Sequence, residues 1–247
     1  MTTYFISDLH LSANRPELTQ LFLKFLADDL KNADALYILG DLFEMWIGDD
    51  NTDPHNQQVM DALAHCSQSG IPLYFMHGNR DFLIGNTFAQ KTQCVLLKDP
   101  SVVLIQNEPV LLTHGDLLCT LDTRYQRFRR FVRQPWVQVL FLKLPLSWRQ
   151  KIAKRLRQHS SRPKMLGGAE TIKKTEPRHW DVALNTVFEF LRTHQTTTLI
   201  HGHTHKPKIH EFLLDNHPAK RIVLGDWGKT GSVLCFSTNE IALKQVI

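Results

Sequence analysis

The feature of this sequence that most constrains its fold is a recurring pair, in which a short apolar run is followed by a polar cluster rich in aspartate, histidine and asparagine. The apolar runs are rich in β-branched and aromatic residues, which is typical of buried strands. Because open α/β sheets place their ligand-binding loops at the carboxyl ends of strands, the clusters should meet at one edge. They are Ser7 to His10, Gly40 with Asp41, His77 to Asp81, His114 to Asp116, and His201 to His205.

Helical patterns alternate with the first strand-like runs and predict a β-α-β-α-β beginning. Pro16 can occupy the first turn of one helix, and Asp53 with Pro54 can begin the next. Another amphipathic pattern covers 181–194, and short strand-like runs follow at 209–214, 222–224, 233–236 and 241–246. The sequence therefore predicts an α/β fold in which sheets are flanked by helices.

Residues 124–158 have helical periodicity that is interrupted at Pro135 and Pro145, and an irregular link follows at 160–178. We expect a body formed by residues 1–121 and 181–247 and a helical insert at 122–180. The stretch 124–164 holds 13 of the 29 Lys and Arg and no acidic residue, which leaves 16 basic and 24 acidic residues elsewhere. A basic insert on an acidic body predicts a surface for an anionic partner, such as nucleic acid, a phosphorylated lipid or a bilayer.

Composition favours a cytoplasmic protein. No run reaches the roughly 18 apolar residues of a membrane span, and Met1 to Thr3 leads into a strand-like run without the features of a signal peptide. The scattered spacing of the cysteines favours reduced thiols over disulfides or a thiolate metal site. They are Cys66, Cys94, Cys119 and Cys235.

Seven side chains of the polar clusters form a mixed nitrogen and oxygen ligand set that is large enough for two metal ions. With Asp41 as the bridge, one ion would take Asp8, His10, Asp41 and His205, and the other Asp41, Asn79, His114 and His203. Two ions about 3.5–4 Å apart can bind a bridging water, lower its pKa and clamp a phosphoryl group during displacement.

Each motif alone has a simpler interpretation. A turn accounts for Asp8 with His10, and a turn or a helix cap for Gly40 with Asp41. A single His114 at a strand end is more often a half-buried, hydrogen-bonded residue than a ligand. The occurrence of five motifs in order, each after a strand-like run, favours the metal site.

The five motifs are Asp8-x-His10, Gly40-Asp41, Gly78-Asn79-x-Asp81, His114 and Gly202-His203-x-His205. In this order they resemble the signature of the calcineurin-like metallophosphoesterases. The resemblance implies a four-layer α/β/β/α sandwich, a dinuclear centre with the ligands given above, and hydrolysis of a phosphoester or phosphoanhydride. It also implies catalytic roles for Asp41, Asn79, His114 and His203. Arg80, which follows Asn79, is our further catalytic candidate.

Arg80 departs from the family, most of whose members have a histidine after the asparagine, where it can protonate a leaving oxygen. Arginine does not release its proton near neutral pH, but its planar guanidinium suits phosphate oxygens. The departure therefore favours a phosphoanhydride, whose leaving group is weakly basic, over an alkyl phosphodiester. The alternative is that Arg80 is a surface ion-pair partner of Asp81.

Stretches at 40–46, 78–83, 114–122 and 136–146 resemble a narrower group of the family, which cleaves the pyrophosphate of a UDP-linked diacylglucosamine in lipid A synthesis. This resemblance implies attack of a metal-activated water on the nucleotide-side phosphorus, with UMP and 2,3-diacylglucosamine 1-phosphate as products and two Mn²⁺ ions as cofactors. It implies substrate contacts at Asn79, Arg80, Asp122, Ser160 and His203. The pattern departs after Ser160, where Lys174 is our choice for a lysine contact.

The insert suits a substrate with two acyl chains. Its apolar side chains could line a groove for the chains, and the cations beside them could reach an anionic membrane surface. We therefore expect a monomer bound peripherally to the cytoplasmic face of the inner membrane, with no nucleic acid partner. Alternatively, the apolar side chains only pack the insert onto the body. They are Phe128, Phe131, Trp136, Val139, Leu140, Phe141 and Leu142.

Two other functions compete with this one. The chain could be a dinucleoside polyphosphate hydrolase or a nuclease, whose binding would weaken steeply with salt. It could also be a scaffold of the same fold that does no chemistry, but all seven predicted ligands are present.

Overall fold

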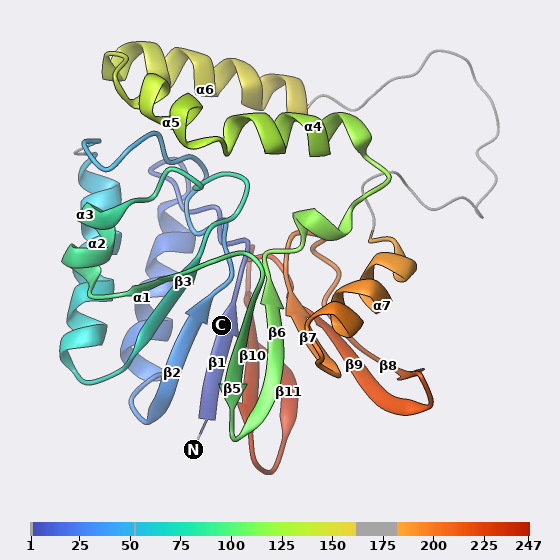
Figure 1. Cartoon of the computed structure of the whole chain (residues 1–247). Helices are drawn as coiled ribbons and strands as arrows, with labels where there is room; N and C mark the ends of the chain where they lie inside the picture. Colours follow the sequence, from blue (N-terminus) through green and yellow to red (C-terminus); the bar gives the residue numbers. More distant parts are fainter. Residues whose placement is uncertain (1, 52, 162–181) are drawn as a thin grey trace, which may run out of the picture.

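The computed structural model describes residues 2–51, 53–161 and 182–247, without the side chains of 158–161, and shows two β-sheets packed face to face (Figure 1). The first sheet contains β1 (Thr2–Ile6), β2 (Ala33–Ile38), β3 (Leu73–Met76), β4 (Val95–Leu97), β10 (Gly231–Ser237) and β11 (Ile241–Val246). The second contains β5 (Ser101–Ile105), β6 (Glu108–Thr113), β7 (Thr198–His201), β8 (Lys208–Leu214) and β9 (His217–Val223). Their orders are β11-β10-β1-β2-β3-β4 and β5-β6-β7-β9-β8.

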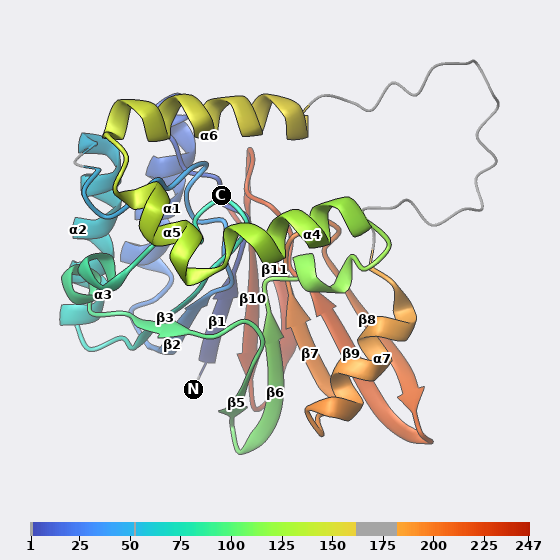
Figure 2. The same cartoon turned by 45° about the horizontal axis from the view of Figure 1, so that its top comes forward.

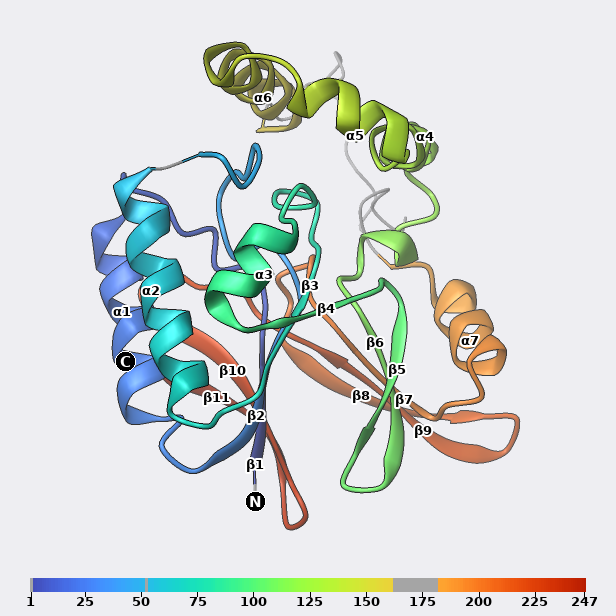
Figure 3. The same cartoon turned by 60° about the vertical axis from the view of Figure 1, so that its left-hand side comes forward.

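Helices cover the outer face of each sheet (Figure 3). The first sheet is covered by α1 (Pro16–Asp28), α2 (Pro54–Gln68) and α3 (Asn86–Thr92), and the second by α7 (Leu184–Thr193). Three apolar clusters fill the three interfaces between these layers, with Phe22 in the first, Phe5 in the second and Val187 in the third. The predicted four-layer α/β/β/α sandwich is confirmed.

The β-α-β-α-β beginning is confirmed as well. Pro16 stands in the first turn of α1, and the side chain of Asp53 caps α2 by accepting from the His55 N–H over 2.8 Å. Strands β1, β2 and β3 are parallel, so their carboxyl ends lie at one edge. The sequence interpretation missed α3, β4 and β5, and it began the last helix three residues before Leu184.

Three helices lie across the carboxyl ends of the central strands (Figures 1 and 2). They are α4 (Thr123–Val132), α5 (Pro135–Leu142) and α6 (Leu146–Ser161), so the predicted helical breaks at Pro135 and Pro145 are confirmed. A short 3-10 helix, Asp116–Leu118, precedes them. Among the residues that the structure describes, no helix is both long enough and apolar enough to span a bilayer.

Most of the apolar side chains of these helices do not pack on the body. No residue of α4 or α5 is buried, and Phe141 alone of the seven predicted lipid-facing residues packs against a core of the body. The other six are exposed, with Trp136 at 58% and Phe131 at 55%. Packing onto the body therefore does not account for the apolar character of α4 and α5.

Several insert cations, in contrast, face the body. Arg129 of α4 donates from Nε to Asp116 over 2.7 Å and from Nη2 to Asp99 over 2.9 Å. The others are Arg133 with the Gly78 carbonyl, Arg149 with Asp50, and Arg157 with Glu44. These four arginines thus link the three helices to the body.

Candidate metal centre

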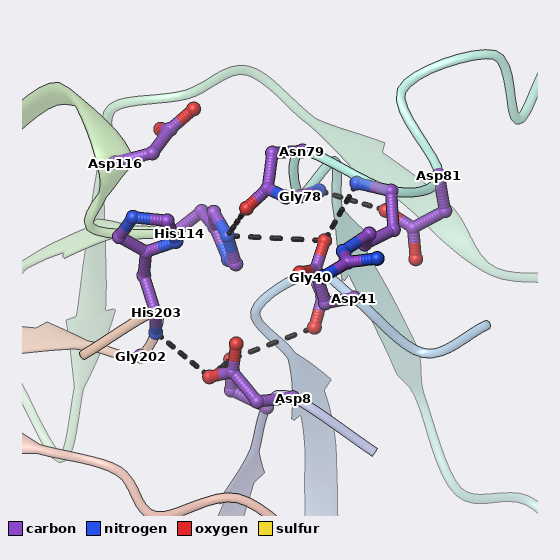
Figure 4. A network of polar contacts seen from close by, with 12 residues as sticks. Asp8, Gly40, Asp41, Gly78, Asn79, Asp81, His114, Asp116, Gly202 and His203 are labelled. Atoms are coloured by element: carbon purple, nitrogen blue, oxygen red, sulfur yellow. Dashed lines mark hydrogen bonds and ion pairs between the residues drawn. The ribbon is translucent and has the colours of Figure 1, made fainter. Parts of the chain in front are cut away.

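The predicted polar clusters meet at the carboxyl ends of β1, β2, β3, β6 and β7. Figure 4 shows Asp8, Asp41, Asn79 and His114 converging from separate loops. The His203 N–H donates to Asp8 Oδ2 over 2.7 Å, although the two residues are 195 positions apart in the chain. The structure therefore places residues from both sheets at one site.

Five of the seven predicted ligands have a left-handed backbone conformation. The φ angles are 58° at Asp8, 51° at His10, 54° at Asp41, 67° at His203 and 55° at His205. This conformation costs a residue with a side chain roughly 1–2 kcal/mol, although Asp and His tolerate it better than most. Such strain is typical of functional sites, where the surrounding fold imposes it.

Two glycines allow the loops to approach so closely. A Cβ at Gly78 would lie 2.1 Å from Asp41 Oδ1, and a Cβ at Gly202 would lie 2.0 Å from Ser7 Oγ and 2.4 Å from Asp8 Oδ2. All three distances are far below van der Waals contact. The glycines of the Gly-Asn and Gly-His motifs therefore make room for the carboxylates that they adjoin.

Asp8, His10 and His205 form the first group that could hold a cation, with one ligand atom from each within 4.8 Å of the others. His205 Nε2 lies 3.2 Å from Asp8 Oδ1, and the rings of His10 and His205 are 5.5 Å apart. Asp8 Oδ1 is buried and accepts no hydrogen bond of good geometry, although His205 Nε2 lies within ion-pair distance of it. A buried carboxylate oxygen that accepts no hydrogen bond is typical of a metal ligand.

Asp8, Asp41 and His114 form the second group under the same criterion. The Asp41 carboxylate lies between two imidazoles, with Oδ2 3.9 Å from His10 Nε2 and Oδ1 3.9 Å from His114 Nε2. A ligand that bridges two ions needs this placement. His114 Nδ1 donates to the Leu39 carbonyl over 2.8 Å, which leaves Nε2 facing the site.

Asn79 and His203 complete the predicted second ligand set. Asn79 Oδ1 lies 3.0 Å from His114 Nε2, and the His203 ring lies 5.1 Å from the His114 ring, so both border the second group. Neither residue belongs to the two groups described above. Their role as ligands stays a prediction.

The protonation of the site reflects buried negative charge. Burial raises the pKa of Asp41 to about 7. Burial alone would lower the pKa of His205, but hydrogen bonds to Asp226 and Asp8 outweigh it and raise the value to about 10. The carboxylates of the site thus favour positive charge beside them, which is the environment that a divalent cation requires.

The site offers nitrogen and oxygen ligands, and it includes a buried carboxylate oxygen that accepts no hydrogen bond of good geometry. The imidazoles of His114 and His205 are held through the ring nitrogen that faces away from the site. These features all suit divalent first-row metals. We conclude that the residues present fit a metal site.

His201 does not take part in this site, although it begins the histidine-rich cluster. It is the last residue of β7, fully buried, and Arg221 Nε donates to its Nε2 over 2.9 Å. Burial, and after it the Arg221 charge, lowers the pKa of His201 to about 3. The prediction that the polar clusters meet at one edge therefore does not hold for the side chain of His201.

Arg80 lies at the rim of the site and pairs with Glu44 rather than with Asp81. Its Nη1 donates to Glu44 Oε1 over 2.9 Å. Asp81 is fully buried and accepts the N–H groups of Gly78 and Leu42, each over 2.8 Å. The alternative of a surface pair between Arg80 and Asp81 is thus wrong, and Asp81 braces the loops after β2 and β3.

The other predicted substrate residues are placed only in part. Asp122 caps α4, because its Oδ1 accepts from the Tyr125 N–H over 3.0 Å. The side chain of Ser160 and the whole of Lys174 lie outside the described residues.

The structure adds two groups that the sequence interpretation missed. Asp226 Oδ2 lies 3.4 Å from His205 Nδ1, on the side of the ring that faces away from Asp8. Its signal was present, because Gly225 with Asp226 follows β9 as Gly40 with Asp41 follows β2. The Tyr125 hydroxyl donates to Asp116 over 2.5 Å, and its ring lies 6.3 Å from that of His203.

Comparison with known proteins agrees with this site. Residues 1–207 match the family model described as calcineurin-like phosphoesterase. A protein of Aeromonas hydrophila named UDP-2,3-diacylglucosamine hydrolase is 51% identical over 245 residues, which cover 99% of this chain and 98% of that protein. A protein of the same name from Escherichia coli O17:K52:H18 is 46% identical over 243 residues, which cover 98% of each chain.

Proposed function

Because the chain belongs to the calcineurin-like phosphoesterase family, we propose that it hydrolyses UDP-2,3-diacylglucosamine to UMP and 2,3-diacylglucosamine 1-phosphate in lipid A synthesis. The names of its relatives support the substrate. The observation that carries the chemistry is the pair of ligand groups that share the buried carboxylate of Asp8. A metal-dependent hydrolase needs such a site, and a scaffold does not.

We infer that Asp8, His10, Asp41 and His205 hold one ion and that Asp41, Asn79, His114 and His203 hold the other. Two Mn²⁺ ions, when bound, would supply an activated water for attack on the nucleotide-side phosphorus and would neutralise charge on the phosphate oxygens.

The chain's own residues position the reacting groups. Asp41 and His114 are fixed by the Arg80 N–H and the Leu39 carbonyl, over 2.8 Å each, so little rearrangement is needed when substrate binds. Asn79, Arg80 and His203 border the site and would bind the pyrophosphate oxygens. No general acid is required, because the leaving group is a phosphate monoester of low basicity.

We assign residues 122–180 as the lipid-binding insert and expect Asp122, Ser160 and Lys174 to contact the head group. The exposed aromatic and aliphatic side chains of α4 and α5, such as Trp136 and Phe131, support contact with acyl chains. Cations of α4 are exposed on the same helix, including Arg124, Arg127 and Arg130. This combination suits a monomer bound to the cytoplasmic face of the inner membrane.

The test is release of UMP from UDP-2,3-diacylglucosamine by purified protein with Mn²⁺, beside diadenosine tetraphosphate and a bis-aryl phosphodiester. His10→Ala is the control, because it removes one ligand of the first group. We expect cleavage of the lipid substrate alone, seen as UMP release, and only by the unmodified protein. No UMP above the control would refute the substrate assignment, and cleavage of diadenosine tetraphosphate instead would support the rival hydrolase.

Hydrolysis in H₂¹⁸O tests the phosphorus that is attacked. Attack on the nucleotide-side phosphorus puts the label in UMP, whereas attack on the sugar-side phosphorus puts it in the lipid phosphate. Label in the lipid product would contradict the proposed direction of attack while leaving the substrate assignment intact.

A further inference from the structure

A carboxylate that has no place among the predicted site residues, Glu44, lies between two cations at the edge of the metal centre. Its Oε1 is 2.9 Å from Arg80 Nη1 and 2.7 Å from Arg157 Nη2. Its Oε2 is 3.9 Å from His10 Nδ1. One side chain thus joins the loop after β3, helix α6 of the insert and the loop that carries a predicted metal ligand.

The backbones on both sides of this contact are held in place. The Glu44 N–H donates to the Leu11 carbonyl over 2.9 Å, one residue from His10. The Arg80 carbonyl accepts from the Trp46 N–H over 3.0 Å, and its N–H donates to Asp41 Oδ1 over 2.8 Å. Glu44 itself is 15% exposed at its side chain. The pair is therefore part of the built site rather than a mobile surface contact.

The contact leaves most of the Arg80 guanidinium available. A guanidinium has five N–H donors in a planar fork, and Glu44 engages the Nη1 group. The remaining donors can bind phosphate oxygens in the bidentate manner that this group favours. Arg157 shares the same carboxylate oxygen, so loss of the Glu44 charge would leave two cations close together and drive Arg80 away from its present position.

We propose that Glu44 is a positioning residue that aims the Arg80 guanidinium at a phosphate oxygen of the substrate. The inference rests on the proposed function, because it assigns that oxygen to the pyrophosphate of UDP-2,3-diacylglucosamine. It predicts a change in phosphate affinity opposite to the change expected from charge alone. A negative charge near an anion site should weaken phosphate binding by Coulomb repulsion, so its simple removal should strengthen binding. If Glu44 positions Arg80, removal of its charge should instead weaken phosphate binding.

Calorimetric titration of the Mn²⁺-loaded protein with inorganic phosphate separates the two effects. We expect Glu44→Gln to weaken phosphate binding about tenfold, as the loss of one charge-assisted hydrogen bond does. In an Arg80→Ala background the same change should alter binding less than about twofold, because the group that Glu44 positions is gone. Tighter or unchanged binding by Glu44→Gln, or an equal loss in both backgrounds, would overturn the proposal.

Glu211→Gln is the matched control, because it removes a carboxylate that pairs with Lys220 over 3.5 Å across β8 and β9. It should leave phosphate binding unchanged. If Glu44→Gln does not fold, Glu44→Asp keeps the charge and shortens the side chain by one methylene. Positioning then predicts weaker phosphate binding, whereas charge alone predicts no change.

Steady-state kinetics distinguish this proposal from the proposed function. With UDP-2,3-diacylglucosamine, Glu44→Gln should lower kcat/KM by about tenfold in the native background and by less than about twofold beside Arg80→Ala. If the effect of Glu44→Gln on phosphate binding depends on Arg80, but the unmodified protein releases no UMP, the substrate is refuted and the role of Glu44 is kept. If UMP is released but the effect of Glu44→Gln is the same with and without Arg80, only the role of Glu44 is refuted.

Discussion

Arg129 joins the insert to the body, and its replacement should be costly. Its guanidinium lies 2.7 Å from Asp116 and 2.9 Å from Asp99, whose side chains are 0% and 4% exposed. Methionine would keep the apolar stem but leave two buried carboxylates without this cation. Removing one partner of a buried ion pair costs about 3–5 kcal/mol. Arg133 remains 3.9 Å from Asp116, so we expect Arg129→Met to lower the free energy of unfolding by about 3 kcal/mol, the lower end of that range.

Urea denaturation followed by circular dichroism measures this change. All samples should contain a chelator, since metal binding to the folded state would otherwise add to the stability. Arg192→Met is the matched control, because it breaks an equally short but solvent-exposed pair with Asp215 and should have a much smaller effect. A loss of less than about 1 kcal/mol in Arg129→Met, or one equal to that of the control, would refute the reasoning.

Three further predictions concern metal binding and the insert. Asp226→Asn should weaken metal binding about tenfold, because the carboxylate that orients His205 loses its charge, and competition with a chelator would show an unchanged affinity if this is wrong. Gly202→Ala should abolish binding of at least one ion, because the added Cβ falls 2.4 Å from Asp8 Oδ2, and elemental analysis that found full occupancy would contradict the close approach. Trp136→Ser should reduce sedimentation with anionic lipid vesicles, whereas Leu104→Ser, which changes an exposed residue of β5, should not.

The position of the metal centre could be predicted because it depends on connectivity. Parallel strands place their carboxyl ends at one edge, so Asp8 after β1 and Asp41 after β2 had to lie near each other whatever the details of packing. Asp226 obeys the same rule after β9, where Gly225 with Asp226 repeats the pattern of Gly40 with Asp41. His201 was misjudged because the alternation of a histidine cluster does not say where the strand stops, and β7 includes His201.

Elements at the edges were harder to predict. In β5, the outward side chains Val102 and Leu104 are apolar and exposed, so the strand lacks the alternation that marks a half-buried strand. Helix α3 has seven residues, which is too short for a helical period to repeat. Both elements owe their structure to the neighbours that pack on them, which a single sequence does not reveal.

The sequence alone also does not show which basic side chains of the insert face the body, and this distinction bears on function. Tyr125 and Arg129 of α4 and Arg133, which caps its carboxyl end, lie four residues apart, so helical geometry alone puts them on one face. Helical periodicity does not determine which face of α4 meets the body. The buried carboxylate of Asp116 selects that face, and Asp116 belongs to another element. Once this face is used, the membrane attraction that we propose must come from cations on the other faces, such as Arg127. Substitution of Arg127 should therefore weaken vesicle binding without a large loss of stability, and Arg129→Met should do the reverse.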